Sequence, residues 1–515
     1  MKFKFKSHHL LLVILLLVSL FLHLYRLEPL MNFHSDEGRD LLIMKKMFDT
    51  HKPALLGPRT STGNMFLGPL YYYLVAPALY LAHFNPLGPV IFLGLIGVFN
   101  TWLIYFLGTK LKDNRFGLLT ATLFTFSPLA LLTYRNSWNP NLMPLISTLL
   151  FLVYLKFKTS FRQGTNLRLP LFLVGILFGI DLQLHYFSLL LIVVFSFYLW
   201  LITKSKVRLL FNLPYLLLGL FLTTLPFWIF ELRHQFINTK AIFQFLQPQP
   251  HQGNFSFPPS PQLYFHRLTK VWLNFWAASF GRLALQINDQ ISLLFAKLFT
   301  LLNFIWLGIL FRRRRLHLSS FIIYLTFFLA AFYRGNIYFH YLLFLLPFNY
   351  FLVANWFTDH NLPKLFRFTS ILLISLTFLW SLPRTYQYLT ASSNHQVEKS
   401  REIIDFIAKD AGSTPYNIVT AHDNTRGTTY QYFASLLPNP PSNHLQTTVY
   451  LICEDRPCNQ KDIESPWLFR RGPAHPGLEP YLGHPFLTEF TQPRHLVWNR
   501  HIVWGVWVAK LHLDL

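Results

Sequence analysis

Long apolar runs recur between residues 9 and 382 of this chain, and they constrain its fold more than any other feature. A straight helix needs about 20 apolar residues to cross a bilayer, and eleven runs reach or approach that length. They lie at 9–27, 88–108, 116–134, 142–155, 169–184, 187–203, 209–230, 291–311, 318–333, 338–356 and 365–382. Charged residues make up only 13% of the chain, about half their share in soluble domains. We therefore expect an all-α polytopic membrane protein with about 11 transmembrane helices.

The basic residues between these runs predict the orientation of the spans, because Lys and Arg concentrate in short cytoplasmic loops. Six short segments hold 19 of the 45 Lys and Arg residues: the N-terminus, 109–115, 156–168, 204–208, 312–317 and 357–367. A further run at 67–82 contains two prolines and three consecutive tyrosines, and we expect it to lie in the outer interface. If it crossed the membrane, every later basic loop would face outward. The prediction is a multi-pass protein of the cell membrane with its N-terminus in the cytoplasm and its C-terminus outside.

The net charge of +23 could also indicate a nucleic-acid partner or anionic lipid headgroups. The densest basic run, at 312–315, is flanked by two apolar runs, which is typical of a topology signal. We therefore expect membrane lipids and no nucleic acid among the partners.

The composition changes after Pro383, where the chain becomes polar and contains no spanning run. This divides it into a transmembrane domain, 1–383, and a small extracytoplasmic α/β domain, 384–515. The hydrophobic periodicity predicts a helix over 396–410 and strands at 416–421, 447–452 and 501–509. Cys453 and Cys458 would pair if this domain lies outside the cytoplasm; two inert thiols are the alternative.

An acid pair, Asp36 and Glu37, follows the first apolar run by about nine residues and should lie near the outer membrane surface. Ser35 is the expected N-cap of a helix that begins here. The two acids could merely complement the helix dipole. Other polar residues at the expected outer ends of spans favour a functional role instead.

Those polar residues gather in short segments on the outer side. Ionisable residues at membrane depth are costly, so they usually line a cavity and have a function. The candidates are His34, Arg39, Arg135, Asn139, Asn141, Asp181, His185, Tyr186, Glu231, Arg233, Arg282, Arg334, His340 and Tyr341.

A carboxylate beside the membrane with cations on the same side suits transfer from a lipid-linked phosphate. Such a phosphate is a good leaving group that needs cationic or metal stabilisation of the departing charge. Arg135, Arg233 or Arg282 could supply it. The attacking hydroxyl needs a general base, and Asp36 fits that role. In-line attack at an anomeric carbon would invert its configuration.

Several short motifs, in their order along residues 9–356, resemble a known family. They are Asp36-Glu37-Gly38-Arg39 after the first span, Gly68-Pro69-Leu70-Tyr71-Tyr72-Tyr73, the basic turn KLKDNRFG at 110–117, Phe126-Ser127-Pro128, and His340-Tyr341 before Pro347. Together they resemble the protein O-mannosyltransferase and aminoarabinose-transferase branch of the C-type membrane glycosyltransferases.

The resemblance implies a polyprenyl-phosphate sugar donor, an extracytoplasmic active site, interfacial helices in the first outer loop, and Asp36 as the catalytic base. The chain departs from the family where Asn139 and Asn141 stand in place of a second acid, and where the His185-Tyr186 region replaces a lysine. These departures leave metal dependence and donor identity open. We assign no cofactor, although Glu37, His185 and His340 could hold a divalent ion if they meet.

The leading hypothesis is inverting transfer of a sugar, hexose or pentose, to an extracytoplasmic lipid, glycan or protein. A glycan ligase or polymerase with a longer lipid-linked donor is one alternative. A lipid-linked glycan flippase or transporter is another, although transporters carry their charges near the bilayer midplane. A scaffold or sensor using 384–515 is a third.

Overall fold

The computed structural model describes residues 7–60, 65–247, 260–281, 289–314, 317–421, 427–442, 444–464 and 492–514. These residues form two compact units, which we describe separately. The helix-bundle unit comprises residues 1–25, 55–71 and 90–391. The C-terminal unit comprises residues 26–54, 72–89 and 392–515.

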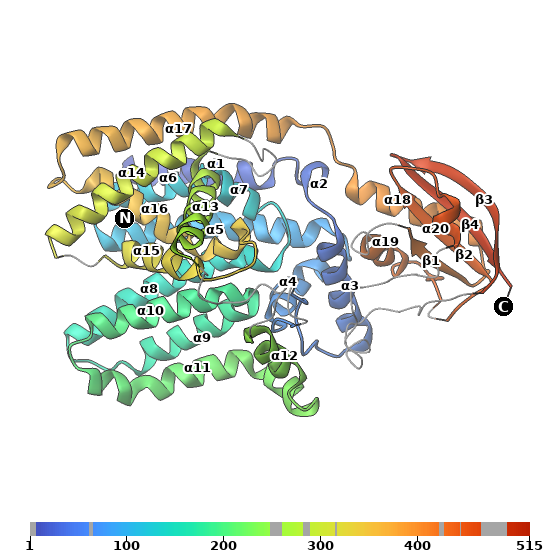
Figure 1. Ribbon diagram of the computed structural model, residues 1–515, viewed down its shortest axis with the longest axis horizontal. Helices are drawn as coiled ribbons and strands as arrows, with labels where there is room; N and C mark the ends of the chain where they lie inside the picture. Colours follow the sequence, from blue (N-terminus) through green and yellow to red (C-terminus); the bar gives the residue numbers. More distant parts are fainter. Residues whose placement is uncertain are drawn as a thin grey trace, which may run out of the picture. The chain divides into compact units, whose positions relative to one another are not determined.

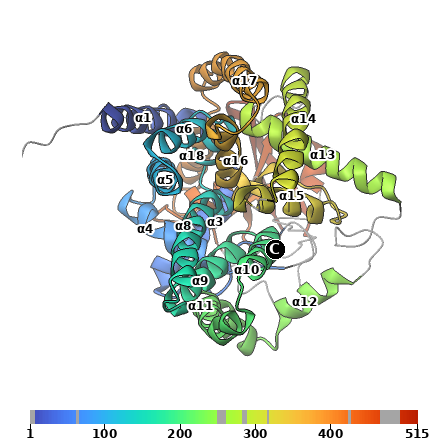
Figure 2. The same ribbon diagram turned by 90° about the vertical axis from the view of Figure 1, so that its left-hand side faces the viewer.

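The helix-bundle unit consists of long apolar helices, most of which run side by side (Figure 1) and are seen nearly end-on in Figure 2. The α-helices are α1 (Ser7–Leu24), α5 (Leu87–Leu111), α6 (Asn114–Thr125), α7 (Pro128–Thr133), α8 (Met143–Arg162), α9 (Arg168–Leu184), α10 (Leu189–Ile202), α11 (Lys206–Arg233), α12 (Ile237–Leu246), α13 (Pro261–Phe280), α14 (Gln290–Arg312), α15 (Leu318–Ala330), α16 (Leu346–Thr358) and α17 (Lys364–Thr390). Short 3₁₀ turns precede α8, α10 and α16: η1 (Asn139–Leu142), η2 (Tyr186–Ser188) and η3 (Phe339–Leu345).

All eleven apolar runs coincide with helices of this unit. In the described residues, seven helical segments are long and apolar enough to cross a membrane, and three further apolar helices, Leu70–Leu81, Tyr186–Ile202 and Leu318–Ala330, are shorter. The run 116–134 is divided into α6 and α7 where the Ser127 hydroxyl accepts a hydrogen bond from the Ala130 amide, with Pro128 in the first turn. The 20-residue helix α13 was not expected from the sequence. It lies across the direction of the neighbouring helices (Figure 2).

Lipid-facing and helix-facing residues are clearly separated in the bundle. Large apolar side chains such as Phe211, Phe304 and Leu379 are exposed, as expected for surfaces that contact lipid. Helices α9 and α11 pack closely because glycines lie at their contact: a Cβ at Gly175 would lie 1.9 Å from the Leu216 carbonyl oxygen. The prediction of a multi-pass, mainly helical membrane protein is confirmed.

The basic loops of the bundle come together at one end. Lys112 donates to the Thr358 hydroxyl at 2.9 Å, and Arg313 forms an ion pair with Asp359 at 2.9 Å. Asn114 contacts His8 at 3.2 Å. Four of the six segments that the charge count assigned to a single side therefore lie next to one another: the N-terminus, 109–115, 312–317 and 357–367.

The C-terminal unit contains a four-stranded sheet in the order β1-β2-β4-β3. Strand β1 (Tyr416–Thr420) is parallel to β2 (Thr448–Glu454). Strand β4 (Val506–Leu513) is antiparallel to both of its neighbours, β2 and β3 (Arg494–Val503). Its helices are α18 (Gln396–Ala411), α19 (Gly427–Ala434) and α20 (Gln460–Glu464). The segment between the first two apolar runs adds α2 (Leu27–Leu30), α3 (Ser35–Thr50) and most of α4 (Leu70–Leu81).

The C-terminal unit confirms some expectations and corrects others. Helix α18 and strands β1 and β2 match the predicted elements, and Cys453 and Cys458 form a disulfide. The predicted strand 501–509 is wrong, because a turn at Trp504 and Gly505 divides this region between β3 and β4. Helix α17 continues through the predicted boundary at 383, and the division into domains 1–383 and 384–515 stays a prediction.

Candidate functional site

Helix α3 of the C-terminal unit carries the acid pair at its first turn. The helix begins at Ser35 with His34 as its N-cap, one residue earlier than expected, because the Glu37 carboxylate accepts a hydrogen bond from the His34 amide at 3.1 Å. Glu37 therefore caps the helix, and Asp36 is left to interact elsewhere.

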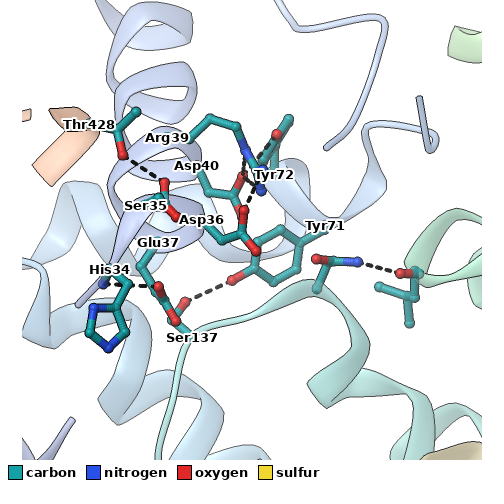
Figure 3. A network of polar contacts seen from close by, with 12 residues as sticks. His34, Ser35, Asp36, Glu37, Arg39, Asp40, Tyr71, Tyr72, Ser137 and Thr428 are labelled. Atoms are coloured by element: carbon teal, nitrogen blue, oxygen red, sulfur yellow. Dashed lines mark hydrogen bonds and ion pairs between the residues drawn. The ribbon is translucent and has the colours of Figure 1, made fainter. Parts of the chain in front are cut away.

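Asp36 belongs to a cluster of four residues that we call the Asp–Arg cluster: Asp36, Arg39, Asp40 and Tyr72. Arg39 Nη1 donates to Asp36 Oδ1 at 2.7 Å, while its Nη2 and Nε donate to Asp40 Oδ1 at 2.8 and 2.9 Å. The Tyr72 hydroxyl donates to the same Asp40 oxygen at 3.1 Å. In Figure 3 both carboxylates turn toward the guanidinium of Arg39, and the His34 ring points away from them.

The two aspartates of this cluster differ in exposure. The Asp40 side chain is 1% exposed and that of Asp36 is 45% exposed. Within the described residues, Arg39 is the one hydrogen-bond partner of Asp36, and it takes only Oδ1. Asp36 Oδ2 is therefore available to accept a proton from a bound molecule.

Burial raises the pKa of two acids near the start of α3, Glu37 and Asp40. Burial raises the pKa of Glu37 to about 8, and the negative charge of the adjacent Asp36 acts in the same direction. Burial also raises the pKa of Asp40 to about 6, against the opposing effect of Arg39. Glu37 is thus largely protonated at neutral pH, which limits the negative charge around Asp36.

Helix α3 is held in place by α19 of the same unit. A Cβ at Gly38 would lie 2.7 Å from the Thr429 amide nitrogen, so only glycine allows this approach. The Thr428 hydroxyl donates to the Ser35 carbonyl at 2.7 Å (Figure 3). No sequence pattern indicated this contact, because 393 residues separate Ser35 from Thr428.

The helix-bundle unit contains a second group of candidates, which we call the histidine cluster: Trp138, His185, His340 and Tyr341. Ring centroids are 4.4 Å apart for His185 and Tyr341, 4.3 Å for Trp138 and His340, and 6.0 Å for the two histidines. The Phe187 amide donates to His185 Nδ1 at 3.1 Å, which places the proton of a neutral ring on Nε2. Loops predicted to share the outer side therefore do meet.

Other residues of the bundle that were predicted to bind substrate form hydrogen bonds within the bundle. Arg135 is fully buried and donates to the Leu22 and Tyr25 carbonyls at 2.7 and 2.8 Å and to the Tyr388 hydroxyl at 3.3 Å. This network ties helix ends together, and phosphate binding by Arg135 stays a prediction.

Asn139 and Tyr186 also bond backbone carbonyls, of Leu184 and Phe66 respectively. Asn141 donates to the Asn136 carbonyl at 2.8 Å. Their polar groups are therefore engaged within the bundle. Tyr71, from the Tyr-rich motif, bonds Ser137 in the same unit at 2.8 Å (Figure 3).

The remaining cations are less constrained. Arg233 and Arg334 are exposed, and Arg282 lies outside the described residues. Among the residues that the structure describes, no three His, Cys, Asp or Glu side chains are grouped to hold a metal ion. Glu37 belongs to the C-terminal unit and His185 and His340 to the helix-bundle unit, so a metal site formed by these three residues stays a prediction.

Sequence reasoning missed Asp40 and Tyr72. The i and i+4 spacing of Asp36 and Asp40, with Arg39 between them, could have indicated a shared face of α3. Tyr72 lay within a noted motif, but its bond to Asp40 depends on tertiary packing.

Comparison with solved structures places this architecture among known membrane proteins. ArnT from Cupriavidus metallidurans bound to undecaprenyl phosphate is similar over 98% of this chain and 97% of that one, with a TM-score of 0.57 and 11% identity. The chain has the fold of ArnT. The apo structure of ArnT matches over the same shares at a TM-score of 0.56 and 12% identity. The Archaeoglobus fulgidus oligosaccharyltransferase is more distant, with a TM-score of 0.44, 15% identity, and 86% and 61% of the two chains covered.

No family model matches the chain, and no curated protein matches it in sequence. ArnT is an aminoarabinose transferase with the C-type glycosyltransferase fold. The resemblance inferred from the motifs is therefore confirmed at the level of the fold.

Proposed function

We propose that this protein is a membrane glycosyltransferase that moves a sugar from a polyprenyl-phosphate donor to an acceptor outside the cytoplasm. The observation that carries the proposal is the setting of Asp36, a half-exposed carboxylate at the start of α3, the helix that follows α1 and α2, with one oxygen held by Arg39 and the other available. The shared fold with ArnT, crystallised with undecaprenyl phosphate, supports the choice of donor.

In this reaction Asp36 Oδ2 takes the proton of the acceptor hydroxyl as its oxygen attacks the anomeric carbon. The bond between that carbon and the phosphate oxygen breaks, and the electron pair leaves with the polyprenyl phosphate. Attack from the opposite side inverts the anomeric configuration. Arg39 orients Asp36 through the bond to Oδ1, so its role is positioning rather than direct contact with the phosphate.

A leaving phosphate needs hydrogen-bond donors or cations, and the helix-bundle unit offers candidates of both kinds. His185 has Nε2–H as a donor for a phosphate oxygen, and His340 lies beside it. Arg233 and Arg334 are exposed cations that could reach a lipid phosphate. The expected contribution of Arg282 stays a prediction.

The orientation proposed from the charge count places the histidine cluster and the C-terminal unit outside the cytoplasm. The disulfide between Cys453 and Cys458 supports this side, because disulfides persist in oxidising compartments. Cysteines introduced singly into 72–82 and 109–115 test it: an impermeant thiol reagent should label only the first from outside. Labelling of 109–115 from outside would overturn the topology.

The central test is Asp36→Asn in membranes supplied with a radiolabelled polyprenyl-phosphate sugar. Loss of a general base should lower the transfer rate by about 10²–10⁴-fold. Asp49→Asn is the matched control, because Asp49 lies on the same helix in an exposed pair with Lys45. Full transfer by the Asp36 variant would eliminate this mechanism.

Asp181 favours the transporter alternative. This residue of α9 is 1% exposed, and within the described residues neither of its carboxylate oxygens has a hydrogen-bond partner. Asp181 lies only three residues before the end of α9, however, and transporter charges are usually near the midplane. If Asp181→Asn abolished lipid-linked sugar translocation while Asp36→Asn had no effect on either assay, a flippase would be the better description.

A further inference from the structure

The C-terminal unit contains a cavity of about 190 Å³ beside the start of α3. It is lined by Phe33, His34, Asn394, Gln396, Lys399, Ser400, Thr429, Glu454 and Asp455. These residues come from the N-cap of α3, the start of α18, α19 and the end of β2. His34 is two residues before Asp36, so the cavity adjoins the helix turn that carries the proposed base.

The lining offers hydrogen-bond donors and acceptors in balance. Lys399 Nζ donates to Glu454 Oε2 at 2.9 Å, and the Tyr430 hydroxyl donates to Glu454 Oε1 at 3.0 Å. The ammonium of Lys399 is therefore neutralised by a buried carboxylate but keeps two further N–H donors. Asp455 adds an exposed carboxylate. A phosphate would need unneutralised donors, and an alkyl chain would need apolar walls, so neither fits this lining.

One wall of the cavity is fixed firmly to α3. Gln396 Oε1 accepts from the Phe33 amide at 2.6 Å, and its Nε2 lies 3.2 Å from His34 Nε2. Asn394 Nδ2 donates to the Met31 carbonyl at 2.9 Å. The C-terminal segment and the residues just before Asp36 are thus held in one arrangement.

An exposed aromatic side chain, Trp504, lies in a turn that is hydrogen-bonded to one of the lining residues, Asp455. Trp504 is 39% exposed at the turn between β3 and β4, and its ring stacks on His395 with centroids 4.6 Å apart. The Asp455 amide donates to the Gly505 carbonyl at 2.8 Å, which brings this turn next to the cavity.

Three residues around this turn have left-handed backbone conformations: His395 with φ 51°, Asp455 with φ 65° and Trp504 with φ 43°. A bulky residue such as tryptophan is unusual there, and asparagine or glycine would suit the turn better. Such strain tends to cluster where a binding function maintains it.

We propose that this cavity binds a single sugar ring. Each sugar hydroxyl is both a donor and an acceptor, which matches the mixed lining, and the C–H face of a sugar ring packs on an aromatic side chain such as Trp504. The cavity volume is that of about six water molecules at about 30 Å³ each. It is smaller than the roughly 300–1,000 Å³ of sites that bind drug-sized ligands. One ring fits; an oligosaccharide does not.

The sugar could belong to the acceptor or to the donor, and its part in transfer rests on the proposed function, whereas binding itself does not. Saturation-transfer NMR of the full-length protein in nanodiscs, with methyl glycosides of several hexoses, pentoses and N-acetylhexosamines, tests the binding. At least one glycoside should bind in the millimolar range. Asp455→Ala and Trp504→Ala should each weaken it at least tenfold, and Trp504→Phe should retain most of it.

The control is Asp405→Ala, which removes an exposed carboxylate of α18 that does not line the cavity. Circular dichroism of each variant establishes that it is folded. No binding by any glycoside, or equal binding by wild type and both cavity variants, would overturn the inference.

Kinetics distinguish the two sources of the sugar. If the ring belongs to the acceptor, Trp504→Ala should raise the KM for the acceptor alone; if it belongs to the donor, the KM for the polyprenyl-phosphate sugar should rise. Asp36→Asn should bind the glycoside normally. If the protein binds glycosides through Trp504 but transfers no sugar, the sugar-binding inference stands and the proposed function is wrong.

Discussion

Two arginines with little solvent exposure, one in each unit, show how differently the same side chain can be used. Arg135 in the helix-bundle unit donates to neutral groups: two backbone carbonyls and a tyrosine hydroxyl. Arg39 in the C-terminal unit donates to two carboxylates. The first arginine ties helix ends together, and the second is neutralised while it orients an exposed acid. An arginine near an expected site therefore has to be judged by its partners.

The largest effect on stability should come from Arg39→Met. This change leaves the buried carboxylate of Asp40 without its cation, and breaking such a pair costs about 3–5 kcal/mol. The midpoint of thermal unfolding in detergent should fall accordingly. The double variant Arg39→Met/Asp40→Asn should regain much of the loss, and failure to do so would mean that Asp40 is not ionised in the folded protein.

Arg135→Met should cost less, about 1–3 kcal/mol, because it removes hydrogen bonds to two backbone carbonyls and a tyrosine hydroxyl. The same unfolding assay measures it, and the transfer rate per folded molecule should change little. A drop in that rate comparable to the one expected for Asp36→Asn would show that Arg135 acts on the phosphate after all.

Gly38→Ala should displace α3 from α19, because the added methyl group would overlap the Thr429 backbone. Overpacking of this kind costs about 1–3 kcal/mol, and transfer should fall together with the unfolding midpoint. Gly308→Ala on α14 is the matched control, since a Cβ at that position would meet nothing within 4 Å. Unchanged unfolding and activity in Gly38→Ala would indicate that the contact between α3 and α19 is loose in solution.

The pH dependence of stability should reveal the acids of the first turn. Folded Glu37 keeps its proton up to about pH 8, whereas the unfolded chain loses it near pH 4.5. The folded state thus binds more protons in this interval, and its free energy of unfolding falls as pH rises, by at most about 1.4 kcal/mol per pH unit. Asp40 also lowers the free energy of unfolding as pH rises, between about pH 4 and 6.

Glu37→Gln should flatten this dependence between about pH 6 and 8, and Asp40→Asn should flatten it only below about pH 6. Thermal unfolding across the pH range in detergent measures both. Identical slopes in wild type and Glu37→Gln would contradict the raised pKa of Glu37.

Local and compositional features of the fold could be predicted well from the sequence. The eleven apolar runs all coincide with helices, because chain length and hydrophobicity alone decide whether a segment can span a bilayer. Helix α18 and strands β1 and β2 followed from periodicity. The strand predicted at 501–509 failed because Trp504 and Gly505 form a turn with positive φ, and tryptophan is not a residue that marks such a turn.

The candidate site could be predicted only in part. The position of Asp36 after the first span is evident from the sequence. The charge-based topology puts His185 and His340 on the same side, but it does not predict that their rings meet. The roles of Arg39 and Arg135 depend on which oxygens fold next to them, and no local pattern encodes that. Asp40 carries no local signal beyond its spacing from Asp36, because its importance comes from burial and from the bond with Tyr72.

The C-terminal unit is assembled from three stretches that are far apart in the chain, at 26–54, 72–89 and 392–515. Helix α3 is synthesised early, but α19, against which Gly38 packs, leaves the ribosome only after all the spans have been made. Contacts of such sequence separation form late, because long loops must close first. The acid that we propose as the base should therefore reach its working position only once the segment carrying α19 has been made, so that a product truncated before it would insert into the membrane without acquiring activity.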